Sequence, residues 1–255
     1  MAPETLGTTA EAVTERSETG LFTMVEVEIN SRCNKRCVYC PVSIDPPNAQ
    51  PRLMDPALYE RLLDELARLE FAGRLSYHFY NEPLLHPRIV DVVRRTGERL
   101  PAVRQVLYSN GDLLTDELHE RLSDAGIARF IITSHDRKPV PVRPKQVILM
   151  PEDLTISNRG GAMESGAKTL GLPCFAPSTM VIVTVTGDVL LCYEDYYRTQ
   201  SFGNLHDRPL DEIWFSARFE EVRRRLVRGD RTVTPVCRSC NNRSHQRPEP
   251  FDYVP

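Results

Sequence analysis

Hydrophobic and polar positions follow two different periods along the first 160 residues. Short runs that are alternating or wholly apolar predict strands over residues 25–30, 75–80, 106–109, 130–133 and 147–150, with one more near 152–157. Between them, apolar residues recur at helical spacing. The clearest helix follows Asp55-Pro56, an N-cap with proline at the first helical position, and others are expected around residues 89–93 and 118–125. Residues 134–145 are rich in proline and predict a connection without a helix.

Alternating strands and helices indicate parallel βαβ units. The predicted fold class is therefore α/β, a partial (β/α)6 TIM-like barrel that is too short for the eightfold form. The chemistry of such barrels lies at the carboxyl ends of the strands, and Asn81-Glu82-Pro83 and Asn110-Gly111-Asp112 both fall there.

The pattern changes after Gly160-Gly161. A β-hairpin is expected over residues 179–192 with its turn at Gly187-Asp188, followed by a helix from Leu210 on which residues 223–225, three arginines, form a solvated face. This predicts a small C-terminal domain of a β-hairpin and a helix. The expected division is a flexible N-terminus (1–20), the barrel (21–165) and the C-terminal domain (166–255).

Composition excludes several classes of protein. The chain has 255 residues and a net charge of −3, without a basic stripe interleaved with aromatics, so nucleic acid is not an expected partner. No apolar run is long enough for a membrane span, and no signal peptide is apparent, so we expect a cytoplasmic protein without a membrane partner. In that reducing compartment, an odd number of cysteines, seven, favours metal binding over disulfides.

The first cysteine cluster, Cys33, Cys37 and Cys40, directly follows the first predicted strand. Three thiolates can bind a 4Fe–4S cluster and leave one iron open for a substrate or cofactor. A zinc knuckle, or three unrelated buried thiols, would be the alternatives.

The second set consists of Cys174, Cys192, Cys237 and Cys240, at both ends of the hairpin-and-helix unit. Four thiolates suit either a zinc ion or a fully ligated 4Fe–4S cluster, and their spacing does not separate the two.

The C-x3-C-x2-C spacing with an aromatic before its last cysteine, followed by Cys, hairpin, Cys, helix and C-x2-C, resembles radical S-adenosylmethionine (SAM) enzymes with a twitch domain, the short form of the SPASM domain. The resemblance implies two 4Fe–4S clusters and SAM, which the open iron chelates and which is cleaved to a 5′-deoxyadenosyl radical. It also implies the SAM contacts, where Asn81 replaces a more usual glycine. These are Tyr39, Asn81, Glu82, Ser109, Asn110 and His135.

Segments such as 157–161 and 194–196 look similar to twitch enzymes that act on aminocyclitols. The resemblance implies a dehydrogenase of antibiotic biosynthesis that oxidises a secondary alcohol to a ketone on an aminocyclitol or aminoglycoside intermediate, of inosamine or spectinomycin type. The auxiliary cluster would take the surplus electron, and a flavodoxin- or ferredoxin-type protein would be the electron donor. Implied catalytic residues are Arg159 and Glu194. The expected substrate contacts are Tyr80, Tyr108, Arg159, Glu194 and His78.

Three other functions stay open at this point. An epimerase on the same substrates would need a thiol to return hydrogen to carbon. A peptide-modifying maturase would need a peptide-binding appendage and more cysteines. A zinc-structured binding module would have no catalysis.

Overall fold

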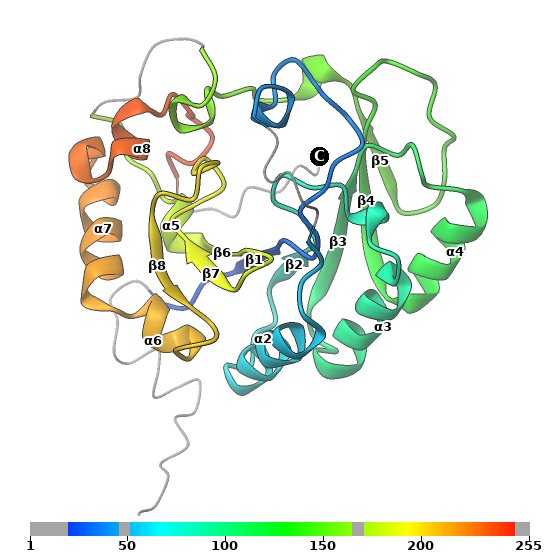
Figure 1. The fold of residues 1–255 in the computed structure, drawn as a ribbon, viewed down its shortest axis with the longest axis horizontal. Coiled ribbons are helices and arrows are strands. Elements are labelled where there is room, and N and C mark those ends of the chain that lie inside the picture. Colours follow the sequence, from blue (N-terminus) through cyan, green and yellow to red (C-terminus); the bar gives the residue numbers. More distant parts are fainter. Residues whose placement is uncertain (1–19, 46–51, 165–170, 248–255) are drawn as a thin grey trace, which may run out of the picture.

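The computed structural model describes residues 20–45, 52–164 and 171–247, and these contain one eight-stranded sheet (Figure 1). Its strand order is β5-β4-β3-β2-β1-β6-β7-β8. The strands from β1 to β5 are parallel, as is β6 to β1, whereas β6, β7 and β8 pair antiparallel. The strands are β1 (Met24–Val27), β2 (Arg74–Ser76), β3 (Arg104–Ser109), β4 (Ile127–Thr133), β5 (Gln146–Leu149), β6 (Met180–Val183), β7 (Asp188–Leu190) and β8 (Ser201–Asn204). The predicted α/β class with a partial parallel barrel is confirmed.

The helices lie in two groups, one on the side of the parallel strands and one on the side of β8 (Figure 1). The first group follows the parallel strands and comprises α2 (Pro56–Arg68), α3 (Ile89–Arg99) and α4 (Asp116–Ala125). The second group belongs to the C-terminal module and comprises α5 (Ala176–Thr179), α6 (Leu210–Trp214), α7 (Ala217–Val227) and α8 (Pro235–Ser239). Short 3-10 turns connect the elements: η1 (Pro41–Ser43), η2 (Pro83–Leu85), η3 (Pro151–Asp153), η4 (Arg159–Gly161) and η5 (Arg231–Val233).

Helix α2 begins where the sequence predicts. The carboxylate of Asp55 accepts a hydrogen bond of 2.7 Å from the backbone amide of Ala57, and Pro56 opens the first turn. Leu62 and Leu66, one turn apart, are fully buried against the sheet. The apolar stripe therefore determines which face of the helix covers the barrel.

The sixth strand is not where it was predicted. Residues 152–157 contain the end of η3 and an irregular segment, and Pro151 opens that turn without a backbone N–H to donate. The place beside β1 is taken instead by β6, which pairs with it in register from Met24–Met180 to Val27–Val183. All four residues of β6 are buried, so the C-terminal module extends the barrel sheet directly.

The predicted hairpin is confirmed, with β6 and β7 as its strands. Gly187 has φ = +85°, and a Cβ atom there would lie 2.9 Å from the side-chain oxygen of Asn204. Both facts favour glycine at this turn.

The predicted C-terminal helix is divided into α6 and α7, and the solvated face expected for its arginines is wrong for Arg223. That side chain is fully buried. Its guanidinium carbon lies 4.2 Å from the centre of the Trp214 ring and 4.6 Å from that of Phe219, and Nη2 donates a 2.6 Å hydrogen bond to the Trp214 carbonyl. Stacking on two aromatic rings explains the burial of a charge that the sequence places on a polar face.

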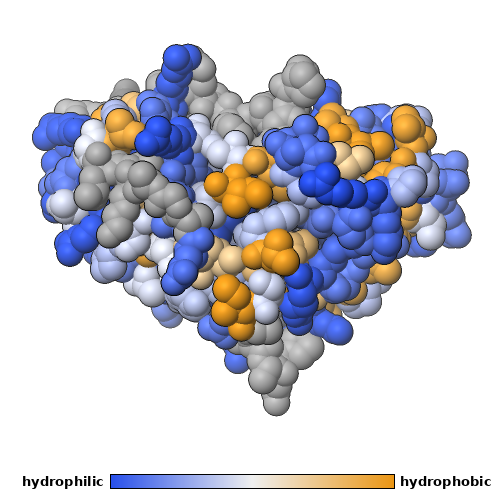
Figure 2. Space-filling view, turned by 90° about the horizontal axis from the view of Figure 1, so that it is seen from above, coloured by the Kyte–Doolittle hydropathy of each residue, from blue (hydrophilic) through white to orange (hydrophobic). Residues whose placement is uncertain are grey.

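The expected flexible N-terminus and the expected domain boundary at 165/166 fall outside the described residues, apart from Gly20. Within the part that is described, no helix combines the length and apolar character needed to cross a bilayer. On the face seen from above, apolar side chains form small groups separated by hydrophilic ones (Figure 2).

Candidate functional site

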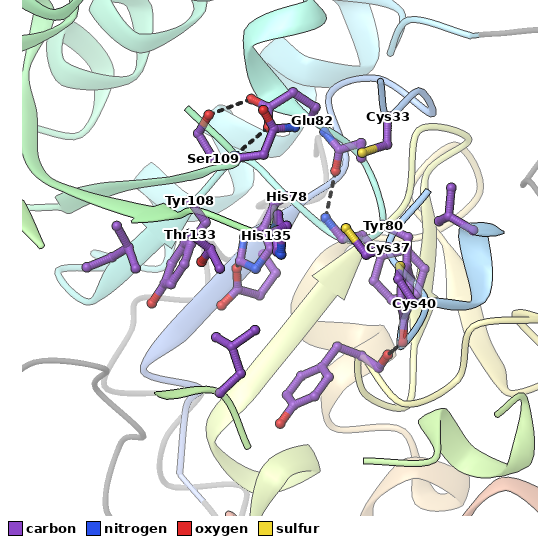
Figure 3. A pocket seen from close by; sticks show the side chains of 18 of the residues that line it. Cys33, Cys37, Cys40, His78, Tyr80, Glu82, Tyr108, Ser109, Thr133 and His135 are labelled. Carbon is purple, nitrogen blue, oxygen red and sulfur yellow. Dashed lines mark hydrogen bonds and ion pairs between the residues drawn. The ribbon is translucent and has the colours of Figure 1, made fainter. Parts of the chain in front are cut away.

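A cavity of about 270 Å³ lies at the carboxyl ends of the parallel strands (Figure 3). Apolar side chains from β4, β5 and β6, among them Ile131, Leu149 and Ile182, form part of its wall. The remaining wall is polar and carries most of the residues that the sequence singled out. A mostly apolar cavity with a few convergent polar groups is the usual form of a small-molecule site.

Cys33, Cys37 and Cys40 line this cavity from the loop between β1 and η1. All three thiols are free and half-buried. Burial raises the pKa of each, and the neighbouring thiols Cys40 and Cys33 help to raise that of Cys37 to about 11. Three crowded thiols with raised pKa values become thiolates when a cation binds among them, so this donor set fits a metal cluster.

Glu82 is buried at the start of η2, where its carboxylate accepts three hydrogen bonds. The donors are the backbone amide of Leu84 at 3.0 Å, the hydroxyl of Ser109 at 2.8 Å and the backbone amide of Asn110 at 2.8 Å. Burial raises the pKa of Glu82, and these bonds oppose the shift. Residues from the ends of β2 and β3 thus form one polar corner of the cavity.

A second polar contact joins the cysteine loop to the end of β4. The hydroxyl of Tyr39 lies 2.5 Å from Nδ1 of His135. Asn81 uses its side chain locally, accepting from the amide of Phe79 and donating to the carbonyl of Tyr77. All six side chains that the sequence analysis assigned to SAM line the same cavity: Tyr39, Asn81, Glu82, Ser109, Asn110 and His135.

Four of the five expected substrate contacts also line this cavity: His78, Tyr80, Tyr108 and Arg159. The hydroxyl of Tyr80 donates a 2.7 Å hydrogen bond to the carbonyl of Tyr193, which joins the barrel to the C-terminal module. Burial lowers the proton affinity of the Arg159 guanidinium, but nearby Tyr80 and Glu194 outweigh it, and its pKa is raised further above its usual range. Arg159 is thus a permanent cation at the cavity wall.

Glu194, the fifth expected contact, lies behind the cavity wall. Only 4% of this residue is exposed, and it lines the small cavity of the second cysteine set. Its carboxylate accepts hydrogen bonds from Ser157 and Asn242, each 2.8 Å long, and one of 3.2 Å from the amide of Gly160. Oε1 is 3.7 Å from Nη1 of Arg159. Glu194 therefore influences the large cavity through its contact with Arg159.

Cys174, Cys192, Cys237 and Cys240 surround the small cavity, with between 4% and 9% of each residue exposed. Burial raises the pKa of all four thiols, and for Cys192 the other three cysteines add to the effect. Across the described ranges, no three acidic, histidine or cysteine side chains are grouped closely enough for one metal ion. The four sulfurs enclose a cavity instead, an arrangement that fits a cluster because a cluster distributes its ligands over several irons.

The sequence analysis did not anticipate two charged residues in the large cavity, Glu26 on β1 and Arg74 on β2. Both are buried, and Nη2 of Arg74 donates a 2.5 Å hydrogen bond to Oε1 of Glu26. The available signal is the position of Glu26 between two valines of β1, which strand alternation explains equally well.

Comparison with known proteins agrees with this architecture. Residues 27–138 match the family model of the radical SAM superfamily, and residues 174–241 match SPASM, an iron–sulfur cluster-binding domain. The chain belongs to the radical SAM superfamily and carries a SPASM-type module.

A curated relative covers nearly the whole chain. The S-adenosyl-L-methionine-dependent 2-deoxy-scyllo-inosamine dehydrogenase of Niallia circulans is 39% identical over 247 residues, which are 92% of this chain and 98% of the relative. The crystal structure of BtrN in complex with AdoMet and 2-DOIA matches with a TM-score of 0.86 at 39% identity, covering 92% of this chain and 98% of that one. BtrN in an open conformation matches with a TM-score of 0.76 at 38% identity, over 92% and 99% of the two chains.

Proposed function

We propose that this protein oxidises a secondary alcohol of an aminocyclitol to a ketone. The observation that carries the proposal is the 39% identity to an inosamine dehydrogenase over 92% of this chain and 98% of the relative. The division of the cysteines supports it, because three line the large cavity and four surround the small one. Inosamine-type and spectinomycin-type intermediates of antibiotic biosynthesis are the proposed substrates.

The two cysteine sets fit two 4Fe–4S clusters, and the corner around Glu82 fits the amino and ribose groups of SAM. When bound, these groups supply a 5′-deoxyadenosyl radical and an electron acceptor. The protein's own contribution is to position the substrate and to keep water away from it. A flavodoxin- or ferredoxin-type protein is the proposed electron donor.

Arg159 and Tyr108 are the proposed hydrogen-bonding partners of the substrate hydroxyls. Arg159 stays protonated and can donate to an oxygen that gains negative charge, so its proposed role is electrostatic stabilisation. Glu194 would hold that guanidinium in place from behind. Tyr80 is tied to the Tyr193 carbonyl and shapes the wall between the two cavities.

A cysteine count argues for a dehydrogenase over an epimerase. An epimerase must return a hydrogen atom to the carbon radical, and a free thiol is the best side-chain donor. The chain has seven cysteines, and the two proposed sites use all of them. A carbon radical beside a hydroxyl would then be converted to a ketone by losing an electron and the hydroxyl proton.

The test is anaerobic turnover of a panel of aminocyclitols with mass analysis of the products, in ordinary and in heavy water. We expect a product lighter than its substrate by two hydrogens, with one SAM consumed per turnover. A product of unchanged composition that carries solvent deuterium on carbon would identify an epimerase instead. Stoichiometric zinc without iron in anaerobically purified protein would remove the basis of the proposal.

A further inference from the structure

His78 follows β2 and lines the large cavity together with Glu26, Arg74 and Tyr108. Its Nδ1 atom lies 3.0 Å from Oε2 of Glu26. On its other side, the ring of Tyr108 packs against it with 4.5 Å between ring centres. The imidazole is thus held between a carboxylate from β1 and an aromatic ring from β3.

Glu26 is itself fixed on both oxygens. Arg74 donates to Oε1 at 2.5 Å, and the hydroxyl of Ser76 donates to Oε2. Burial raises the pKa of this carboxyl, but Arg74, His78 and Ser76 outweigh burial and lower it to about 2. Glu26 is therefore a carboxylate at neutral pH. The Nδ1–Oε2 contact lacks hydrogen-bond geometry, but a negative charge 3.0 Å from Nδ1 favours the tautomer that carries its proton there and leaves Nε2 as the proton acceptor.

The other imidazoles of the cavity each meet a tyrosine hydroxyl. Nδ1 of His135 lies 2.5 Å from the hydroxyl of Tyr39, and Nε2 of His245 lies 2.6 Å from that of Tyr193. His78 instead lies with Nδ1 beside the carboxylate of Glu26, and its side chain is 30% exposed. Since His135 is already assigned to SAM and His245 meets Tyr193, His78 is the imidazole left for a substrate hydroxyl.

The other candidates for accepting a proton are less suitable. Glu82 already accepts three hydrogen bonds and belongs to the corner proposed for SAM. Glu194 lies outside the wall with both oxygens bonded, and Arg159 remains a cation. Oxidising a carbinol nevertheless requires that its hydroxyl proton leave.

We propose that His78, oriented by Glu26, is the general base that takes the proton of the substrate hydroxyl. The inference rests on the proposed alcohol dehydrogenase function. In the balanced reaction, the carbinol C–H hydrogen is lost to the deoxyadenosyl radical, and the O–H bond breaks with its proton going to Nε2 of His78. The surplus electron would go to an iron–sulfur cluster held by the four cysteines of the small cavity as the C=O bond forms. His78 is the catalytic residue and Glu26 a positioning residue.

The test compares His78→Gln, His78→Gly and Glu26→Gln with His206→Gln, a matched change at an exposed histidine outside both cavities. Substrate binding is measured by calorimetry with SAM present and no reductant, and ketone formation by mass analysis. We expect the two His78 variants to bind substrate within about tenfold of wild type while ketone formation falls by about 10²- to 10³-fold. Added imidazole should restore part of the activity of His78→Gly, but not of His78→Gln, which has no space for it.

Glu26→Gln should lower ketone formation by about tenfold and should not respond to imidazole, because the base is present but less well oriented. Iron content and thermal melting of each variant verify the fold. Ketone formation near the wild-type rate in both His78 variants would overturn the inference and leave the dehydrogenase intact. A loss confined to substrate binding in the His78 variants would also overturn the inference. If wild type itself forms no ketone, the proposed function fails, and this inference fails with it.

Discussion

The carboxylate of Glu194 lies 3.7 Å from the guanidinium of Arg159, on the side away from the large cavity. The turn that carries Arg159 packs closely against Glu194. Gly160 has φ = +61°, and a Cβ atom there would lie 2.7 Å from the carbonyl oxygen of Glu194. One residue of the C-terminal module therefore fixes both the charge of Arg159, which lines the large cavity, and the backbone beside it.

Replacing Glu194 with Gln should weaken substrate binding although the residue does not line the cavity. The amide leaves Arg159 without its buried counter-charge and turns an NH2 group toward the donors Ser157 and Asn242. We expect a cost of about 2 kcal/mol, or roughly thirtyfold in the dissociation constant by calorimetry. Glu152→Gln, which alters an exposed ion pair with Arg137, serves as the control. An unchanged constant in Glu194→Gln would show that Arg159 needs no partner.

The barrel and both cysteine sets were predictable because their signals are local in the sequence. Strand and helix periods, the Asp55-Pro56 cap and the cysteine spacings each depend on neighbouring residues. The position of β6 was not predictable in this way. Its pairing with β1 joins Met24 to Met180 across more than half of the chain.

The charges inside the fold were also missed, since periodicity shows which residues share a face but not what that face meets. Glu26 on β1 and Glu28 directly after it alternate with valines in the manner of a half-exposed strand, yet both are buried. Their partners Arg74 and Arg198 come from other elements. Arg223 follows this logic in part, because Trp214 lies on α6, whereas Phe219 lies one turn before Arg223 on α7 itself.

Glu28 should make stability fall as the pH rises. Burial raises its pKa from 4.5 to about 7, and the opposing effects of Arg198 and the Val185 amide are smaller. Between these two values the folded state binds the proton more tightly than the unfolded state, so the free energy of unfolding decreases with pH in this window. From pH 5.5 to 7.5, wild type should lose about 2 kcal/mol relative to Glu28→Gln.

Urea unfolding of both proteins at the two pH values measures this difference. Glu117→Gln, at an exposed position of α4, should follow the wild type. Equal pH dependence in wild type and Glu28→Gln would mean that Arg198 keeps Glu28 ionised throughout.

Arg223 should behave as a core residue in stability measurements. Its Nε and Nη1 atoms have no hydrogen-bond partner among the described residues, and burial lowers its pKa to about 10, so the charge itself adds little. Arg223→Ala should therefore cost about 3 kcal/mol through the cavity it leaves, while Arg223→Met should retain most of the stability. Arg224→Met, on the exposed side of α7, should change stability by less than about 0.5 kcal/mol. Thermal melts of the three variants measure these differences in stability. Equal stability of Arg223→Ala and Arg223→Met would contradict the prediction.

The two cysteine sets should be separable by mutation. Cys237 lies in α8 and Cys240 at its C-cap, and the Thr234 hydroxyl caps this helix by accepting from the Cys237 amide at 3.1 Å. Because the cap is independent of the thiols, Cys237→Ala with Cys240→Ala should keep α8 and lose only the auxiliary cluster. We expect half the iron of wild type, some uncoupled cleavage of SAM and no ketone, since the ketyl radical loses its electron acceptor.

The complementary variant replaces Cys33, Cys37 and Cys40 with Ala. These residues lie in a loop, so the sheet should persist, and the protein should again hold half the iron but cleave no SAM. Iron analysis, absorbance spectra and chromatography of 5′-deoxyadenosine distinguish the two variants from each other and from wild type. Full ketone formation by the first variant would assign the four buried cysteines a purely structural role. In that case the surplus electron would have to leave by another route, and the coupling between the two cavities through Tyr193 and Arg159 would serve folding alone.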